Sequence, residues 1–144
     1  MDRHATALQV AAAVRAKEVS PSEVLDHYLA EADRLDPSLN AFALRDDDRA
    51  RADARAATDL VASTPAGDLP PFLGVPIPIK DLDDVQGWPT THGSAASSPA
   101  PAAADGLEAA RLRRAGVGLT GKTTTPELGA ISCPESDRFF PTPN

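Results

Sequence analysis

The segment Gly74–Asp81, which reads GVPIPIKD, constrains the fold of this chain more than any other segment. It is a short apolar run that ends in a lysine and is followed by an acidic turn. Short apolar runs bounded by turn residues are typical of buried β-strands. Because helical patterns precede and follow this run, it predicts an α/β fold with the lysine at the end of a strand.

The helical patterns place apolar residues on one face of each predicted helix. The second helix has a clear start at Ser20-Pro21-Ser22-Glu23, where Ser20 caps, Pro21 takes the first helical position and Glu23 completes a capping box. We expect Asp36-Pro37 to end this helix. The predicted helices cover residues 5–16, 21–36, 46–62 and 105–116.

Two further segments, Asn40–Leu44 and Val117–Thr120, have the composition of short strands. The predicted order is helix, helix, strand, helix, strand, loop, helix, strand. Strands that are separated by helices imply a sheet with at least partly parallel pairing. The loop contains Gly87–Ser94 and a run of Ala, Ser and Pro over residues 95–104.

Charge and composition exclude several classes of function. The net charge of −7 and the pI of about 4.8 disfavour nucleic acid and anionic membrane surfaces as partners. The single cysteine, Cys133, excludes an internal disulfide and fits a reducing compartment. Since no signal peptide and no apolar run of bilayer length is present, we expect a cytoplasmic protein.

Lys80 is the candidate catalytic residue. A lysine that a buried strand carries out of water is pushed toward its neutral form, which can accept a proton. The pKa of a free lysine is about 10.4, so burial must lower it by about 2–3 units for useful base catalysis. We expect the apolar residues Val75, Ile77 and Ile79 to provide this environment.

Other polar residues have simpler interpretations. Asp81 is expected to form the turn or to accept local hydrogen bonds, and Trp88 to pack or to border the site. His92 has no nearby Cys, Asp or Glu at ligand spacing, so we expect no metal and no cofactor. Lys122 follows Gly121 but lacks the full spacing of a phosphate loop, which predicts a structural role at a strand end. Cys133 is expected to be a free thiol in a loop.

Taken together, these segments resemble the N-terminal part of the amidase signature family, the serine hydrolases with a Ser–cis-Ser–Lys triad. Each motif is weak alone, but six occur in order with suitable gaps over nearly the whole chain. They are Leu39–Phe42, Gly74–Asp81, Asp84–Ser94, Asp105–Gly116, Gly121–Thr123 with Thr125–Glu127, and Pro141–Thr142 with Asn144.

The resemblance implies a fold and a reaction. The fold is a mixed sheet flanked by helices in an α/β/α arrangement. In the reaction a serine attacks a small amide substrate, an amine or ammonia leaves, and water releases the acid. The motif assigns Lys80 to the lysine of the triad, which is hydrogen-bonded to the cis serine.

In the family, the Gly- and Ser-rich segment with the cis serine follows the position of Asn144, and the nucleophile and oxyanion donors lie there and just beyond. Ser94, Ser97 and Ser98 do not occupy those places. We therefore expect residues 1–144 to be the N-terminal part of a single amidase domain, truncated before the catalytic serines. The isolated chain is expected to be inactive.

Two alternatives stay open on the sequence. One is the glutamine amidase of a tRNA-dependent amidotransferase, which frees ammonia from glutamine for charged tRNA. The other is a non-catalytic remnant, or a partner-binding piece that exposes the edge of its sheet. A homo-oligomer is also compatible with the sequence.

Overall fold

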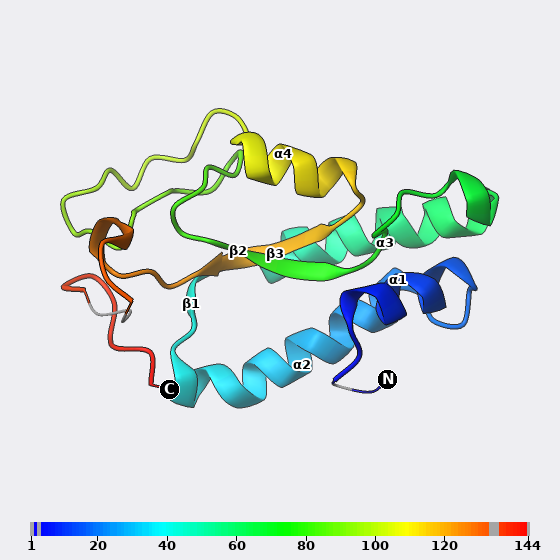
Figure 1. Ribbon diagram of the computed structural model, residues 1–144, viewed down its shortest axis with the longest axis horizontal. Helices are drawn as coiled ribbons and strands as arrows, with labels where there is room; N and C mark the ends of the chain where they lie inside the picture. Colours follow the sequence, from blue (N-terminus) through cyan, green and yellow to red (C-terminus); the bar gives the residue numbers. More distant parts are fainter. Residues whose placement is uncertain (1, 3, 133–135, 144) are drawn as a thin grey trace. The chain divides into compact units, whose positions relative to one another are not determined.

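The computed structural model describes residues 2, 4–132 and 136–143 (Figure 1). Cys133 and Asn144 lie outside the described residues. The order of helices and strands is as predicted. The elements are α1 (Ala7–Arg15), α2 (Pro21–Leu39), β1 (Phe42–Arg45), α3 (Asp47–Ser63), β2 (Pro76–Lys80), α4 (Leu107–Arg114) and β3 (Gly118–Thr123), with short 3₁₀ turns at Ala66–Asp68 and Glu127–Gly129.

The strands form a mixed sheet in the order β1-β3-β2. β1 is antiparallel to β3, with Phe42 opposite Thr123. β2 lies beside β3, as Figure 1 shows, and two backbone hydrogen bonds join them, from Gly118 N to Val75 O (3.0 Å) and from Asp81 N to Thr123 O (3.1 Å). Because both strands advance in the same direction between these two bonds, β2 and β3 are parallel.

The chain divides into two compact units, which we call the helical unit and the loop unit. The helical unit comprises Met1–Asp33, Asp46–Ile77 and Leu112–Thr120, and the loop unit comprises Arg34–Arg45, Pro78–Arg111 and Gly121–Asn144. Strands β2 and β3 each run from the helical unit into the loop unit.

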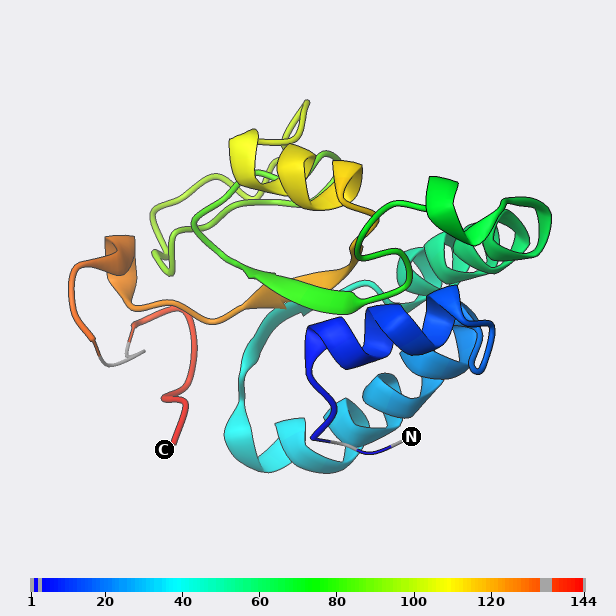
Figure 2. The same cartoon turned by 45° about the vertical axis from the view of Figure 1, so that its right-hand side comes forward.

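The core of the helical unit is built from small aliphatic side chains. Val10 and Val14 of α1, Val24 of α2 and Val61 of α3 are buried together with Val75, just before β2. Figure 2 shows α1 alongside α2. Valine and alanine bury less apolar area than leucine or phenylalanine, so this core gains less stabilisation per residue. Among the described residues, no helix is both long enough and apolar enough to cross a membrane.

The start of α2 is as predicted, but its end is not. Ser20 N donates to Glu23 Oε2 (2.9 Å) and Glu23 N donates to Ser20 Oγ (3.2 Å), which completes the capping box. The helix continues through Pro37 to Leu39. It ends at Asn40, whose φ is 50° and whose N–H still donates to Asp36 O (2.7 Å). An asparagine in the left-handed region is a common helix terminator, so it ends this helix rather than the proline.

The end of α4 is as predicted, since the helix ends at Arg114 and Gly116 follows after one further residue. Its φ is 90°, and a Cβ atom there would lie 2.8 Å from the Cα atom of Leu73. Gly116 N donates to Arg113 O (2.9 Å) and Val117 N donates to Leu112 O (3.1 Å), so the last turn of the helix is satisfied.

Candidate active site

Lys80 is the last residue of β2, as predicted, but its side chain is exposed. The expectation that the strand would bury it is therefore wrong for this structure. Successive side chains of a strand point to opposite faces. Val75, Ile77 and Ile79 share one face with Asp81, and Lys80 lies on the other face with the half-buried Pro76 and Pro78.

The buried lysine of the loop unit is Lys122, in β3. Its side chain is 1% exposed, and its Nζ atom donates to Asp81 Oδ1 (3.2 Å) and to Thr90 Oγ1 (2.6 Å). The predicted position of Lys122 near a strand end is confirmed. The burial of Lys122 and its pairing with Asp81 were not predicted.

Asp81 accepts several hydrogen bonds, which confirms its predicted role as a local acceptor. Its Oδ1 atom accepts from Thr91 N (3.1 Å), and its Oδ2 atom accepts a short hydrogen bond from Thr91 Oγ1. Its own N–H donates to Thr123 O (3.1 Å), and its carbonyl accepts from His92 N (3.1 Å). The residue after Lys80 is thus bonded to β3 and to the loop at residues 91–92.

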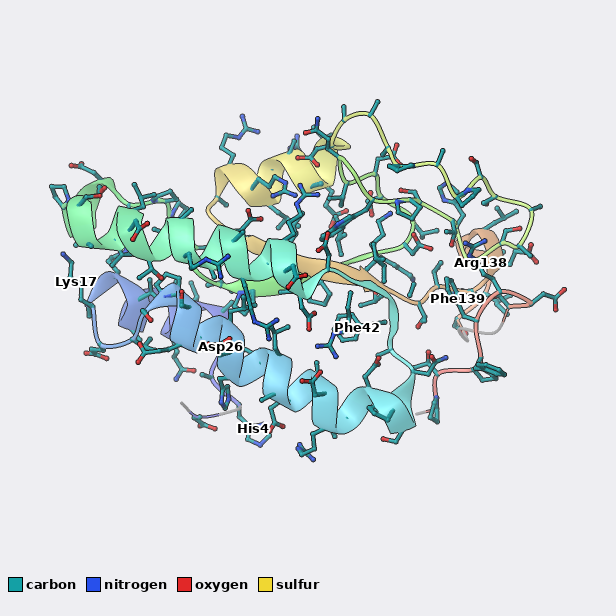
Figure 3. All side chains as sticks on the ribbon, turned by 180° about the vertical axis from the view of Figure 1, so that it is seen from behind. His4, Lys17, Asp26, Phe42, Arg138 and Phe139 are labelled. Atoms are coloured by element: carbon teal, nitrogen blue, oxygen red, sulfur yellow. The ribbon has the colours of Figure 1, made fainter. Side chains whose placement is uncertain are left out.

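The rest of that loop is also held by hydrogen bonds. Ser94 is buried, and its Oγ atom donates to Glu127 Oε1 (2.5 Å). Its carbonyl accepts from Nη1 of Arg138 (3.4 Å), which Figure 3 labels next to Phe139. Ser94 therefore has a structural partner of its own.

A cavity of about 600 Å³, lined by both polar residues and alanines, opens beside this network in the loop unit. Thr90 and His92 contribute to its wall, so one of the two residues that accept from Lys122, Thr90, also borders the cavity. Trp88 is buried, as its packing interpretation predicted. Among the described residues, no group of three His, Cys, Asp or Glu side chains is arranged to hold a metal ion.

The sequence model of the family described as Amidase matches residues 23–144. The chain belongs to the amidase family.

Several family members are similar along nearly the whole chain. AmiB2 of Mycobacterium tuberculosis is 45% identical over 121 residues, which is 84% of this chain and 25% of AmiB2. The acylamidase of Rhodococcus erythropolis is 35% identical over 140 residues, 96% of this chain and 29% of that protein. A component of the glutamyl-tRNA(Gln) amidotransferase of Acidothermus cellulolyticus is 36% identical over 96% of this chain and 27% of that component. The chain thus spans under a third of the length of these relatives.

Solved structures of amidase-family enzymes have the same fold. The structure of 6-aminohexanoate cyclic dimer hydrolase superposes with a TM-score of 0.87 at 30% identity, over 100% of this chain and 28% of that chain. The predicted mixed sheet flanked by helices is therefore confirmed as an amidase-family fold.

Sequence reasoning missed the side-chain contacts of Thr90 and Thr91, and it did not pair Lys122 with Asp81. One signal was available, because Lys122 interrupts an otherwise apolar or small-residue strand. A charge in such a strand requires a partner, and Asp81 follows the neighbouring predicted strand.

Proposed function

We propose that this chain supplies the catalytic lysine of an amide hydrolase, with Lys80 as the lysine of a Ser–cis-Ser–Lys triad. The observation that carries the proposal is the exposed amine at the end of β2, in a family motif whose next residue is anchored by hydrogen bonds. The amine is thus free to meet other groups, while the backbone that carries it is held in place.

In this mechanism the nucleophilic serine attacks the amide carbonyl and transfers its proton through the cis serine to Lys80. The neutral amine of Lys80 is the base, and the leaving amine later receives the proton. Removal of water disfavours the protonated form of an amine, so an amine that further residues of the site cover has a larger neutral fraction, which can accept a proton. The reaction needs no metal and no cofactor.

We place the two serines outside residues 1–144, which form the N-terminal part of a single amidase domain in this proposal. The similarity of relatives that are more than three times as long supports this assignment. In this proposal the chain alone is inactive. We also propose a cytoplasmic location, because its single cysteine fits a reducing compartment.

The proposed substrate is a small amide. The acylamidase of Rhodococcus erythropolis supports a general amidase. A second candidate is a glutamine amidase of the amidotransferase type, which the similar identity to the glutamyl-tRNA(Gln) amidotransferase component supports. The net charge of −7 argues against direct contact of this chain with tRNA.

A chimeric enzyme tests the role of Lys80. Residues 1–144 replace the matching first part of the Rhodococcus erythropolis acylamidase, and hydrolysis of a simple aryl amide is measured. We expect Lys80→Ala to reduce kcat by at least about 100-fold, since a positioned base contributes about that much or more. Lys17→Ala is the control and should leave the rate unchanged, because Lys17 is an exposed residue of the helical unit. Turnover that survives Lys80→Ala would contradict the assigned role.

A further inference from the structure

We infer that the buried Lys122–Asp81 ion pair is a positioning device for Lys80, which fixes the backbone at the end of β2 and keeps the Lys80 amine on the open face of the sheet. The inference rests on the proposed function of Lys80. It assigns Lys122, Asp81 and Thr90 as positioning residues, which act through Lys80 rather than on a substrate.

Burial of the Lys122–Asp81 pair has an energetic cost. Lys122 and Asp81 are each about 1% exposed. Removing two ions from water costs several kcal/mol each, and apolar residues of similar volume are often at least as stabilising. Stability alone therefore gives no reason for charges at these two positions, whereas a requirement for one fixed geometry does.

Asp81 joins the ion pair to the backbone at the end of β2. The Asp81 carboxylate is bonded to Lys122 and to Thr91, and its main chain is bonded to Thr123 and to His92. The peptide between Lys80 and Asp81 cannot rotate without breaking several of these bonds. Because adjacent side chains of a strand point to opposite faces, a fixed Asp81 on the buried face fixes Lys80 on the open face.

The turn after Lys80 is held by hydrogen bonds of the same network. Asp83 N donates to the carbonyl of Lys80 (3.2 Å), and Thr90 Oγ1 donates to the carbonyl of Asp83 (3.4 Å). The same Thr90 hydroxyl accepts from Lys122 Nζ (2.6 Å). The ammonium of Lys122 thus reaches the backbone of Lys80 by two routes, through Asp81 and through Thr90 and Asp83.

The lysine content of the chain makes the inference directly testable. The chain has three lysines, Lys17, Lys80 and Lys122. Lys17 follows α1, is exposed, and is labelled in Figure 3. NMR signals of the three side chains can therefore be resolved and assigned, with Lys17 as an internal reference.

The experiment compares the 144-residue chain with the double variant Asp81→Asn/Lys122→Met. The asparagine keeps an acceptor for Thr91 N, and the methionine keeps most of the lysine volume, so both charges leave without a large cavity. Amide hydrogen exchange is measured at residue resolution, and the Lys80 side chain is followed by its ¹³Cε signal. The milder variant Thr90→Val retains the ion pair and serves if the double variant does not fold.

We expect the amides of Asp81, Asp83 and His92 to exchange at least about 10-fold faster in the double variant, while those of Val24 and Val61 in the helical unit change by less than about 2-fold. The Lys80 signal should shift or broaden, because the backbone that carries it samples further conformations, and the Lys17 signal should not change. Thr90→Val should give the same local pattern with a smaller amplitude.

Two results would overturn the inference. One is a uniform acceleration of exchange in both units with an unchanged Lys80 signal, which would identify a pair that only stabilises the fold. The other is unchanged exchange at Asp81 and Asp83 in a folded variant. Neither result depends on hydrolysis, so a failure of this inference is distinguishable from a failure of Lys80→Ala in the chimera.

Discussion

The Nζ atom of Lys122 lies 3.2 Å from the Oδ1 atom of Asp81, with both side chains about 1% exposed. Loss of one partner leaves a buried charge without compensation, which costs about 3–5 kcal/mol. We therefore expect Lys122→Met to lower the free energy of unfolding by about that amount, as measured by urea denaturation. The double variant Asp81→Asn/Lys122→Met should lose clearly less, because no isolated charge remains. A single variant that loses under about 1 kcal/mol would contradict the buried pair.

Gly121 of β3 lies opposite Arg45 of β1 in the antiparallel register. Its φ is 157°, and a Cβ atom there would collide with the carbonyl oxygen of Leu44. We expect Gly121→Ala to lower the free energy of unfolding by about 2 kcal/mol or more, because the backbone must shift to relieve the clash. Gly118→Ala is the matched control in the same strand, since the nearest atom to its Cβ would be Val75 O at 3.9 Å. Equal losses in the two variants would argue against this pairing of β1 and β3.

Thr125 is 1% exposed, and its Oγ1 atom has no hydrogen-bond partner among the described residues. A buried hydroxyl without a partner costs about 1–3 kcal/mol. Thr125→Val keeps the shape and removes the hydroxyl, so we expect thermal unfolding to shift to a higher temperature.

The adjacent Thr124 is the control for this prediction, since it is also buried but bonded. Its Oγ1 atom is 2.8 Å from Thr142 Oγ1. Thr124→Val should lower the melting temperature, because it leaves a partner unsatisfied. A lower melting temperature for both variants would mean that the Thr125 hydroxyl has a partner in solution.

Local signals in the sequence predicted most of the fold. The capping box at Ser20 and Glu23 and the glycine at position 116 act within a few residues, so their effects could be inferred from the sequence alone. The end of α2 was misplaced because Pro37 was weighed more heavily than Asn40, which takes the left-handed conformation that closes the helix.

The candidate site was predicted less completely. The strand and the position of Lys80 followed from apolar spacing. Burial was assigned to Lys80 although strand alternation places Val75 and Ile79 on the opposite face. The pairing of Lys122 with Asp81 joins residues 41 positions apart, so it depends on the neighbouring placement of β2 and β3. The charge of Lys122 within a strand of apolar and small residues indicates that a partner is needed, but nothing local identifies Asp81 as that partner.

The capping box of α2 predicts a specific acid sensitivity. The backbone N–H of Ser20, and then its hydroxyl, bond the Glu23 carboxylate and lower its pKa below the ordinary value of 4.5. Because the folded-state pKa is the lower one, the contribution of Glu23 to stability is present above about pH 4.5 and is lost as the pH falls through the folded-state pKa. We expect Glu23→Gln to reduce the difference in unfolding free energy between neutral pH and about pH 3. Glu18→Gln is the control, because Glu18 is exposed. An equal reduction of the pH-dependent difference in this variant would show that the capping box is not its cause.

Truncation of Lys80 should leave the stability of the fold nearly unchanged, whereas truncation of Lys122 should lower it. The Lys80 side chain is exposed, so its amine stays hydrated and its removal breaks no buried contact. We expect Lys80→Ala to change the free energy of unfolding by less than about 0.5 kcal/mol, as is usual for surface substitutions, with Lys17→Ala giving a similar small change. Urea denaturation of the parent chain and the two variants measures this. A loss of more than about 1 kcal/mol for Lys80→Ala alone would mean that the side chain is packed in solution. In that case Lys80 would be the buried lysine that the sequence predicted, and its amine would be desolvated before any further residues of the site cover it.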